Sequence, residues 1–433
     1  MPTLADHFAA MLKDATLHNT TLIFEGARRN ILSNLAKAAK DPAAQNVQLP
    51  ENATPDDVLK QIVDSPIDPG VIDSLAEAVG FSELAGFGKY ETGDRGWIGC
   101  LLNYYRFLHD KAGFPLPPVP ANGNSIEGVT NLIAEPADRS GIKIGIVGDW
   151  GTGVWDDGKK NVAKNVIDAM RQHRPDYAIH LGDVYYSGDA KQEISNFLQL
   201  WPFTNHRSYA LNSNHEMYSG GHGYYGTLLK DPEFQHQQAG YFALTNAQWL
   251  IIGLDTAYYS TSHLYQEGAI RDPNDPSSMA QADWLARVVS ANPGKRVIMM
   301  THHDGFDVDG ETLKVAFKTL YQQIALLLQG VSEWWWYWGH VHTAIVYSPV
   351  SPFHNSLLHA RCAGHGAVPY MPFTKRLGKE VIWTEYGLAN NPNDTGVDRG
   401  RAPNGFAILT LTGPDLKEEF YDENNRLQWT GDR

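Results

Sequence analysis

The chain has little cysteine, no long apolar run and no leader-like start. Its 433 residues contain only Cys100 and Cys362, which excludes a disulfide framework and leaves room for one bridge at most. No stretch of about 18 apolar residues occurs, and the opening MPTLADHFAAMLKDA lacks the basic and apolar regions of a signal peptide. We therefore expect a soluble protein of the cytoplasm without a membrane span.

Basic residues are also in the minority. The sequence has 35 Lys and Arg against 49 Asp and Glu, a formal net charge of −14. Because no run of Lys and Arg stands out, the sequence carries no electrostatic footprint for nucleic acid. A polyanionic partner is therefore not expected.

The chain changes character twice along its length. Residues 1–111 carry apolar stripes at helical spacing, which predicts a helical N-terminal domain. Residues 112–140 contain the run FPLPPVPANGNS, and its prolines and glycine indicate a linker. From residue 141 to residue 433, short β-branched runs alternate with helices and end in antiparallel strands, which predicts an α/β layered domain.

Individual elements follow from the same patterns. We expect helices over 156–173 and 281–290, and strands over 143–149, 177–183, 207–213, 249–255, 296–303 and the aromatic run 334–338, followed by three strands after residue 404.

The aromatic run WWWYW, residues 334–338, has two possible explanations. It is either a platform for stacking a ligand or a strand buried on both faces. Since it is apolar at both odd and even positions, a strand buried between two layers is favoured. Gly339 would then let the chain turn and direct His340 and His342 to different places.

Five motifs with acid or histidine residues follow expected strands. They are GDWG (148–151), GDVYY (182–186), SNHE (213–216), THHDG (301–305) and GHVH (339–342). Ligands bind at the carboxyl ends of strands in an α/β sheet. These motifs therefore predict one site at that edge.

The donor atoms of these motifs suit transition metals. They supply carboxylate, amide and imidazole groups from Asp149, Asp183, Asn214, His302, His340 and His342. This mixed set suits Zn, Mn or Fe rather than Ca or Mg, and it is too large for one tetrahedral site. A pair of metals that shares a carboxylate is the usual arrangement for in-line displacement at phosphorus. The pattern therefore predicts phosphoester hydrolysis.

In this order the motifs resemble those of the calcineurin-like metallophosphoesterase superfamily. The first two resemble its purple acid phosphatase branch, which reads GDxG, GDxxY, GNHE, VxxH and GHxH. The resemblance covers about residues 141–345. It implies an α/β/β/α sandwich of mixed sheets, a dinuclear metal centre, and hydrolysis of phosphate esters, with monoesters favoured, by a metal-bridging hydroxide.

The resemblance also implies roles for particular residues. Asp183 would bridge two metals, with Asp149, Tyr186 and His342 completing one site and Asn214, His302 and His340 the other. His215 would stabilise the transition state or protonate the leaving oxygen, and His303 would face the phosphate. A Tyr186 phenolate would favour Fe(III) paired with Fe(II), Zn(II) or Mn(II); without it, zinc or manganese is expected.

Some positions depart from the family pattern. Ser213 replaces the usual Gly, Met299 replaces Val, and Gly151 stands where most of the superfamily has His. Alternatives also stay open at this stage. Tyr186 could be a packing residue, the substrate could be a phosphodiester, and the fold could serve a binding or regulatory protein without turnover.

Overall fold

The computed structural model describes residues 100, 103–104, 106–117, 126–138, 140–154, 162–306, 318–370, 378, 380–385 and 401–433. The chain divides into two units, one of residues 1–110 and 390–399 and one of residues 111–389 and 400–433. The predicted N-terminal helical domain lies almost wholly outside the described residues. Cys362 is not in a disulfide, so the single bridge to Cys100 that the sequence allowed is not formed.

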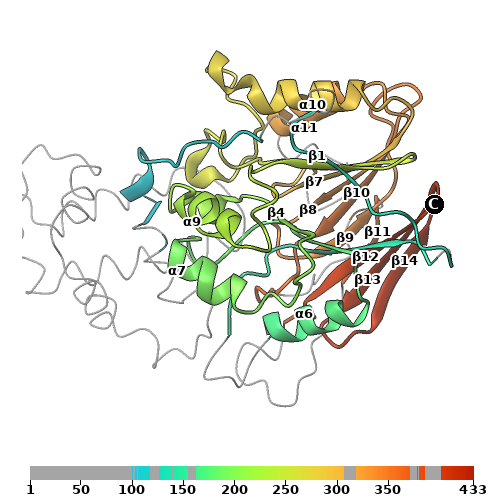
Figure 1. Ribbon diagram of the computed structural model, residues 1–433, viewed down its shortest axis with the longest axis horizontal. Helices are drawn as coiled ribbons and strands as arrows, with labels where there is room; N and C mark the ends of the chain where they lie inside the picture. Colours follow the sequence, from blue (N-terminus) through green and yellow to red (C-terminus); the bar gives the residue numbers. More distant parts are fainter. Residues whose placement is uncertain are drawn as a thin grey trace, which may run out of the picture. The chain divides into compact units, whose positions relative to one another are not determined.

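Two mixed β-sheets form the second unit (Figure 1). The larger contains, in spatial order, β1 (Val129–Asn131), β5 (Phe242–Thr245), β6 (Trp249–Gly253), β7 (Arg296–Thr301), β8 (Glu333–Trp338), β10 (Leu357–Ala363), β9 (Ala344–Tyr347) and β11 (Val381–Thr384). The smaller contains β14 (Leu427–Asp432), β13 (Asp415–Asp422), β12 (Gly405–Thr412), β2 (Ile142–Val147), β3 (Tyr177–His180) and β4 (Ser208–Ala210).

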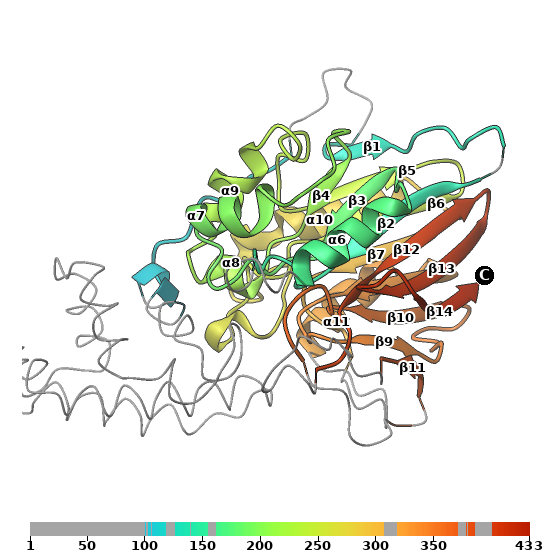
Figure 2. The ribbon, with the colours of Figure 1, turned by 90° about the horizontal axis from the view of Figure 1, so that it is seen from below.

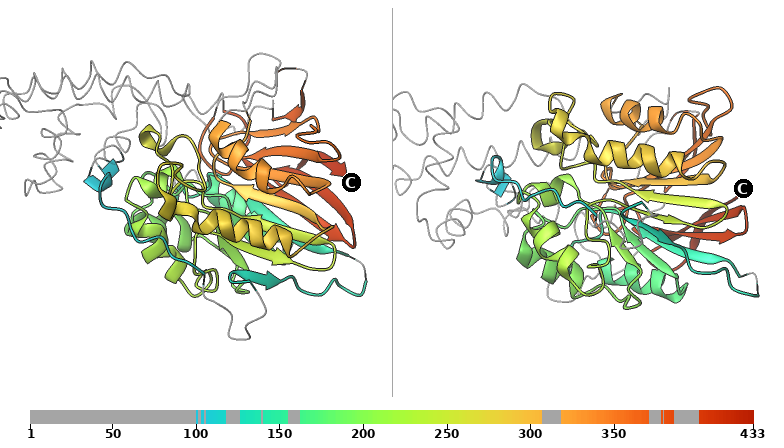
Figure 3. Two further views of the ribbon diagram at one scale, coloured as in Figure 1. Left: turned by 90° about the horizontal axis from the view of Figure 1, so that it is seen from above. Right: turned by 45° about the horizontal axis from the view of Figure 1, so that its top comes forward.

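Helices cover the outer faces of this pair of sheets. The helices α10 (Ala280–Ser290) and α11 (Lys318–Leu327) lie over the larger sheet (Figures 1 and 3). The helix α6 (Val162–Gln172) lies over the smaller sheet (Figure 2). Met170 on this helix occupies the space that a side chain at Gly145 would need. One apolar core fills the space between the sheets and another lies beneath α10 and α11. The predicted α/β/β/α sandwich is confirmed.

The aromatic strand β8 separates the two cores. Its three even-numbered tryptophans, at 334, 336 and 338, pack in the core beneath the helices, whereas Trp335 and Tyr337 pack between the sheets. All five side chains are 0% exposed. The strand is therefore buried on both faces, as predicted, and cannot be an open stacking platform.

Several elements were not expected from the sequence. The strand β1 lies within the segment predicted as a linker and pairs with β5, so part of that segment belongs to the larger sheet. The short helices, all missed, are α7 (Ala190–Gln192), η3 (Glu193–Leu198), α8 (Asn214–Met217), α9 (His222–Gly226), η4 (Leu228–Lys230), η5 (His263–Tyr265) and η6 (Pro276–Met279). Among the described residues, no helix is long and apolar enough to cross a membrane.

Candidate metal centre

The motif residues come together where strands of both sheets end. Asp149 and Asp183 follow β2 and β3 in the smaller sheet, and Asn214 begins α8 after β4. His302 and His340 follow β7 and β8, which are neighbours in the larger sheet. The sandwich therefore brings donor groups from two sheets to one place.

Close backbone packing holds the Asp149 side chain. The backbone N–H of His340 donates to Asp149 Oδ2 at 2.8 Å. A Cβ at Gly339 would lie 2.5 Å from the same oxygen, and one at Gly364 would lie 2.8 Å from it. Since side-chain atoms do not approach that closely, glycine is needed at both positions. The predicted turn at Gly339 thus also makes room for a carboxylate.

Asp149, Asp183, Tyr185 and His342 form the first donor group. The Tyr185 hydroxyl lies 2.7 Å from Asp183 Oδ2 and 2.7 Å from His342 Nε2. His342 Nε2 is also 3.4 Å from Asp149 Oδ1. Oxygen and nitrogen donors therefore converge on the Oδ2 side of Asp183.

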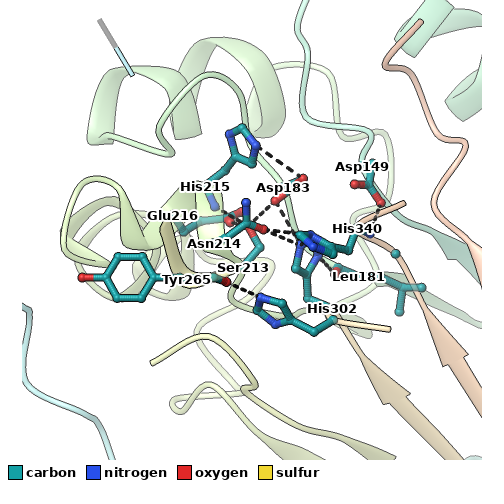
Figure 4. A network of polar contacts seen from close by, with 12 residues as sticks. Asp149, Leu181, Asp183, Ser213, Asn214, His215, Glu216, Tyr265, His302 and His340 are labelled. Atoms are coloured by element: carbon teal, nitrogen blue, oxygen red, sulfur yellow. Dashed lines mark hydrogen bonds and ion pairs between the residues drawn. The ribbon is translucent and has the colours of Figure 1, made fainter. Parts of the chain in front are cut away.

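Asp183, Asn214, His302 and His340 form the second donor group (Figure 4). His302 Nε2 lies 3.2 Å from Asp183 Oδ1 and 2.8 Å from Asn214 Oδ1. His340 Nδ1 is 3.2 Å from the same amide oxygen. Asp183 thus turns one carboxylate oxygen toward each group.

The neighbours of His302 leave one ring nitrogen available as a donor atom. Its Nδ1 lies 2.9 Å from the carbonyl oxygen of Leu181, which can only accept, so Nδ1 carries the hydrogen. The lone pair is then on Nε2, inside the second donor group. A carbonyl partner of this kind usually orients a ligating histidine. His302 thus directs a ring nitrogen at Asn214, while its role as a ligand stays a prediction.

Burial controls the charges in the centre. Burial and the nearby Asp183 carboxylate raise the pKa of Asp149 well above its usual range. Burial also disfavours ionised Asp183, but His215 and His302 outweigh it and lower the pKa of Asp183 well below its usual range. Burial lowers the pKa of His302 to about 4, so its ring is neutral at pH 7.

This donor set fits metal ions. Ligand atoms of Asp149, Asp183 and His302 all lie within 4.8 Å of one another, and a buried carboxylate pair is costly without a counter-charge. Neutral imidazoles and carboxylates are the forms that bind Zn, Mn or Fe.

The structure favours a different tyrosine from the predicted one. Tyr185 places its hydroxyl against Asp183 and His342. Tyr186, which the GDxxY pattern indicated, is half-buried and presents its backbone carbonyl to His215 Nδ1. The path of the turn decides which of two adjacent side chains faces inward, and the motif spacing alone did not reveal it.

His303 does not present a free nitrogen to a substrate. Its Nδ1 lies 2.8 Å from Thr256 Oγ1, and its Nε2 lies 2.7 Å from the carbonyl oxygen of Tyr265. The ring packs on that of His340, with centroids 4.9 Å apart. Both ring nitrogens of His303 therefore have partners, and its predicted role of facing the phosphate stays a prediction.

His215 lies beside the centre, as the SNHE motif suggested. Its Nε2 is 3.8 Å from Asp183 Oδ2, and its Nδ1 faces the Tyr186 carbonyl. Burial lowers the pKa of His215, although Asp183 opposes this shift. The ring is held at one nitrogen and directs the other toward the Asp183 carboxylate.

Sequence reasoning missed the groups that support the donors. Glu216, the last residue of the SNHE motif, accepts a hydrogen bond from the Val184 N–H at 3.0 Å. It also contacts the Ser213 hydroxyl, which in turn contacts Asp183. Its place in the motif was visible, but nothing in the sequence indicated these partners.

Residues 142–344 match the family model for calcineurin-like phosphoesterases. This segment is a calcineurin-like phosphoesterase domain. Its bounds agree closely with the segment that the motifs indicated. No curated protein matches the chain.

Two solved structures match this chain at low sequence identity. A purple acid phosphatase from yellow lupin (Lupinus luteus) seeds is 14% identical with a TM-score of 0.48, over 67% of this chain and 53% of that one. GAP50, an anchor in the inner membrane complex of Plasmodium, is 11% identical with a TM-score of 0.45, over 67% of this chain and 87% of that one. The present chain thus spans about half the length of the lupin enzyme, 53%.

A buried histidine behind the centre makes the phosphoesterase domain sensitive to acid. His180 ends β3 and packs on the rings of Trp150 and Phe197, and neither of its ring nitrogens has a hydrogen-bond partner in the described part of the chain. Burial lowers the pKa of His180 to about 3. In the unfolded chain its pKa is about 6.5, so the unfolded state binds the proton more readily. Stability is therefore lost as the pH falls from about 6.5 toward 3.

We expect His180→Phe to remove this penalty. The free energy of unfolding should rise by about 2 kcal/mol more at pH 5 than at pH 8, since about 1.5 pH units separate pH 5 from the unfolded pKa. Urea unfolding of the chelator-treated protein at both pH values measures the difference. An equal change at the two pH values would contradict this origin of the acid sensitivity.

Proposed function

We propose that this domain is a metal-dependent hydrolase of phosphate esters with a dinuclear centre, and that phosphomonoesters are its preferred substrates. The observation that carries the proposal is the position of Asp183, whose Oδ1 lies 3.2 Å from His302 Nε2 while its Oδ2 lies 2.7 Å from the Tyr185 hydroxyl. A carboxylate with a candidate metal ligand beside each of its oxygens is suited to bridge two cations.

The two donor groups would hold one cation each. Asp149, Tyr185 and His342 would complete the first site, and Asn214, His302 and His340 the second, with Asp183 shared. Such a pair neutralises charge on the phosphoryl oxygens and lowers the pKa of a water. We infer iron, zinc or manganese from the mixed nitrogen and oxygen donors.

His215 is the residue placed to transfer a proton. Its Nδ1 donates to the Tyr186 carbonyl, which leaves Nε2 as the atom that can exchange a proton with the leaving oxygen. The lowered pKa of His215, caused by burial, leaves the ring neutral at pH 7 when no ester is bound. A neutral ring can accept a proton from a water molecule as well as return one.

Metal analysis and two assays test the proposal. The purified protein should contain two metal ions per chain and should hydrolyse p-nitrophenyl phosphate faster than bis(p-nitrophenyl) phosphate. A chelator should remove both activities, and added metal should restore them. Faster hydrolysis of the diester would change the substrate class. A protein that binds metal but hydrolyses neither ester would favour a binding role.

The two adjacent tyrosines allow a matched comparison at the first site. If Fe(III) is bound, Tyr185→Phe should remove the visible charge-transfer band and weaken the metal at the first site by about 10- to 100-fold. Tyr186→Phe should leave the band in place, since the Tyr186 contact to His215 is through the backbone. Visible spectra and metal content of both variants provide the measurement, and the reverse result would restore Tyr186 as the ligand.

A further inference from the structure

Ser213, which stands where the family pattern has glycine, makes side-chain contacts that a glycine cannot make. Its Oγ contacts Asp183 Oδ1 and Glu216 Oε2, and it accepts the His215 backbone N–H at 3.0 Å. Ser213 is also the N-cap of the short helix that carries Asn214. All these residues are buried. Figure 4 shows Ser213 among Asp183, Asn214, His215 and Glu216.

The hydrogen bonds of Ser213 form a chain that ends on the Asp183 carboxylate. The Ser213 hydroxyl has one hydrogen and two lone pairs, and one lone pair accepts from His215 N–H. The single hydroxyl hydrogen can point to either carboxyl neighbour, so Ser213 links Glu216 Oε2 and Asp183 Oδ1 through one oxygen atom.

Glu216 also holds the backbone beside Asp183. Its other oxygen, Oε1, accepts from the N–H of Val184, the residue that follows Asp183. One side chain therefore contacts both the main chain and, through Ser213, the side chain of the same turn. The direction of the Asp183 carboxylate is therefore restrained both at the backbone and at the side chain.

We propose that Ser213 is a positioning residue that fixes the Asp183 carboxylate between the two donor groups. It restrains Oδ1 on the side of His302, and Oδ2 then faces the Tyr185 hydroxyl. Each carboxylate oxygen is thus directed toward one donor group. This inference rests on the proposed function, because the restraint matters only if Asp183 is shared between two cations. Without it, the carboxylate could rotate and serve one group at the expense of the other.

Three substitutions at Ser213 test the restraint. Ser213→Ala and Ser213→Gly should weaken the binding of one of the two metals by about 10- to 100-fold, the usual effect of losing a group that orients a ligand. Ser213→Thr keeps the hydroxyl and should bind both metals as the wild type does. Metal titration by calorimetry and metal content after dialysis measure the affinities. The fall in activity should appear in kcat more than in KM and be reversed by excess metal.

A control separates metal binding from helix capping. Asp275 is the N-cap of another short helix, accepts from the Ser277 N–H, is exposed, and is not a member of either donor group. Asp275→Ala should therefore remove an N-cap hydrogen bond without changing the metal content. Thermal unfolding of both Ala variants compares their effects on stability.

Glu216 provides a second test if the Ser213 variants do not fold. In Glu216→Gln the amide can still donate to Ser213 and accept from Val184, so both metals should stay bound. Glu216→Ala removes both contacts and should lose one metal.

The outcomes keep the two proposals apart. A wild-type protein that binds two metals and hydrolyses esters, with Ser213→Ala and Ser213→Gly equal to it in both metal affinities, would overturn the positioning role alone. A wild-type protein without a metal pair would overturn the proposed function itself. Loss of metal in Glu216→Gln equal to that in Glu216→Ala would also refute the hydrogen-bond chain.

Discussion

Asp183→Asn should reduce the kcat/KM of phosphate ester hydrolysis by about a thousandfold or more. The amide keeps the size of the side chain but removes the charge that two cations would share, and about 4 kcal/mol of lost transition-state stabilisation corresponds to this factor. Metal content should fall as well. An amide has only one oxygen that can bind a metal, whereas Asp183 has a candidate metal ligand beside each of its two oxygens.

The measurement combines ester hydrolysis with metal analysis at saturating metal. Asp168→Asn is the matched control, since Asp168 lies on α6 and pairs with the side chain of Lys164 at the surface. That control should keep full activity and full metal content. Activity and metal retained by Asp183→Asn would end the proposal of a shared carboxylate.

Glu418→Ala should lower the free energy of unfolding by about 3–5 kcal/mol. Glu418 on β13 accepts two hydrogen bonds from Arg361 on β10, from Nε at 2.7 Å and from Nη2 at 2.9 Å. Trp335 Nε1 also donates to it at 3.2 Å. Both charged side chains are buried, so the substitution would leave the guanidinium without its counter-charge.

The double variant Arg361→Met/Glu418→Leu provides the control for this prediction. Removing both charges together removes the cost of the unpaired guanidinium, although Trp335 and Tyr337 lose their acceptor, so the double variant should be more stable than Glu418→Ala by about 1–4 kcal/mol. Urea unfolding followed by tryptophan fluorescence measures all three proteins. A double variant as unstable as Glu418→Ala would mean that lost packing, not the unpaired charge, causes the effect.

The parts of the fold with strong local patterns were predicted well. The strands β2, β3, β7 and β8 appear where apolar runs end at an acid or histidine motif. Their pattern is local, because a strand buried on both faces must be apolar at every position. The last three strands were predicted from the turns that separate them, which are also a local signal. By contrast β1, with three residues, and β11, an edge strand with an irregular register, carry too little pattern to be recognised.

The donor set was predictable for a different reason. Asp149, Asn214 and His302 lie in three of the five motifs, and the chemistry of their side chains restricts what they can bind. The choice between Tyr185 and Tyr186 was not predictable, because it depends on the backbone path of one turn. The partners of His303 come from a loop about 40 residues earlier in the chain, which no local pattern connects to it.

The sequence by itself thus determined the layered fold class, the buried aromatic strand and the residue types that meet at the candidate centre. These follow from local periodicity and from side chains whose chemistry does not depend on context. Only the tertiary structure decided which tyrosine faces Asp183, that Ser213 and Glu216 restrain this carboxylate, and that Arg361 and Glu418 pair between the sheets. Each of these contacts joins side chains whose directions depend on the backbone path or on the packing of separate strands, so neither spacing nor composition could reveal them.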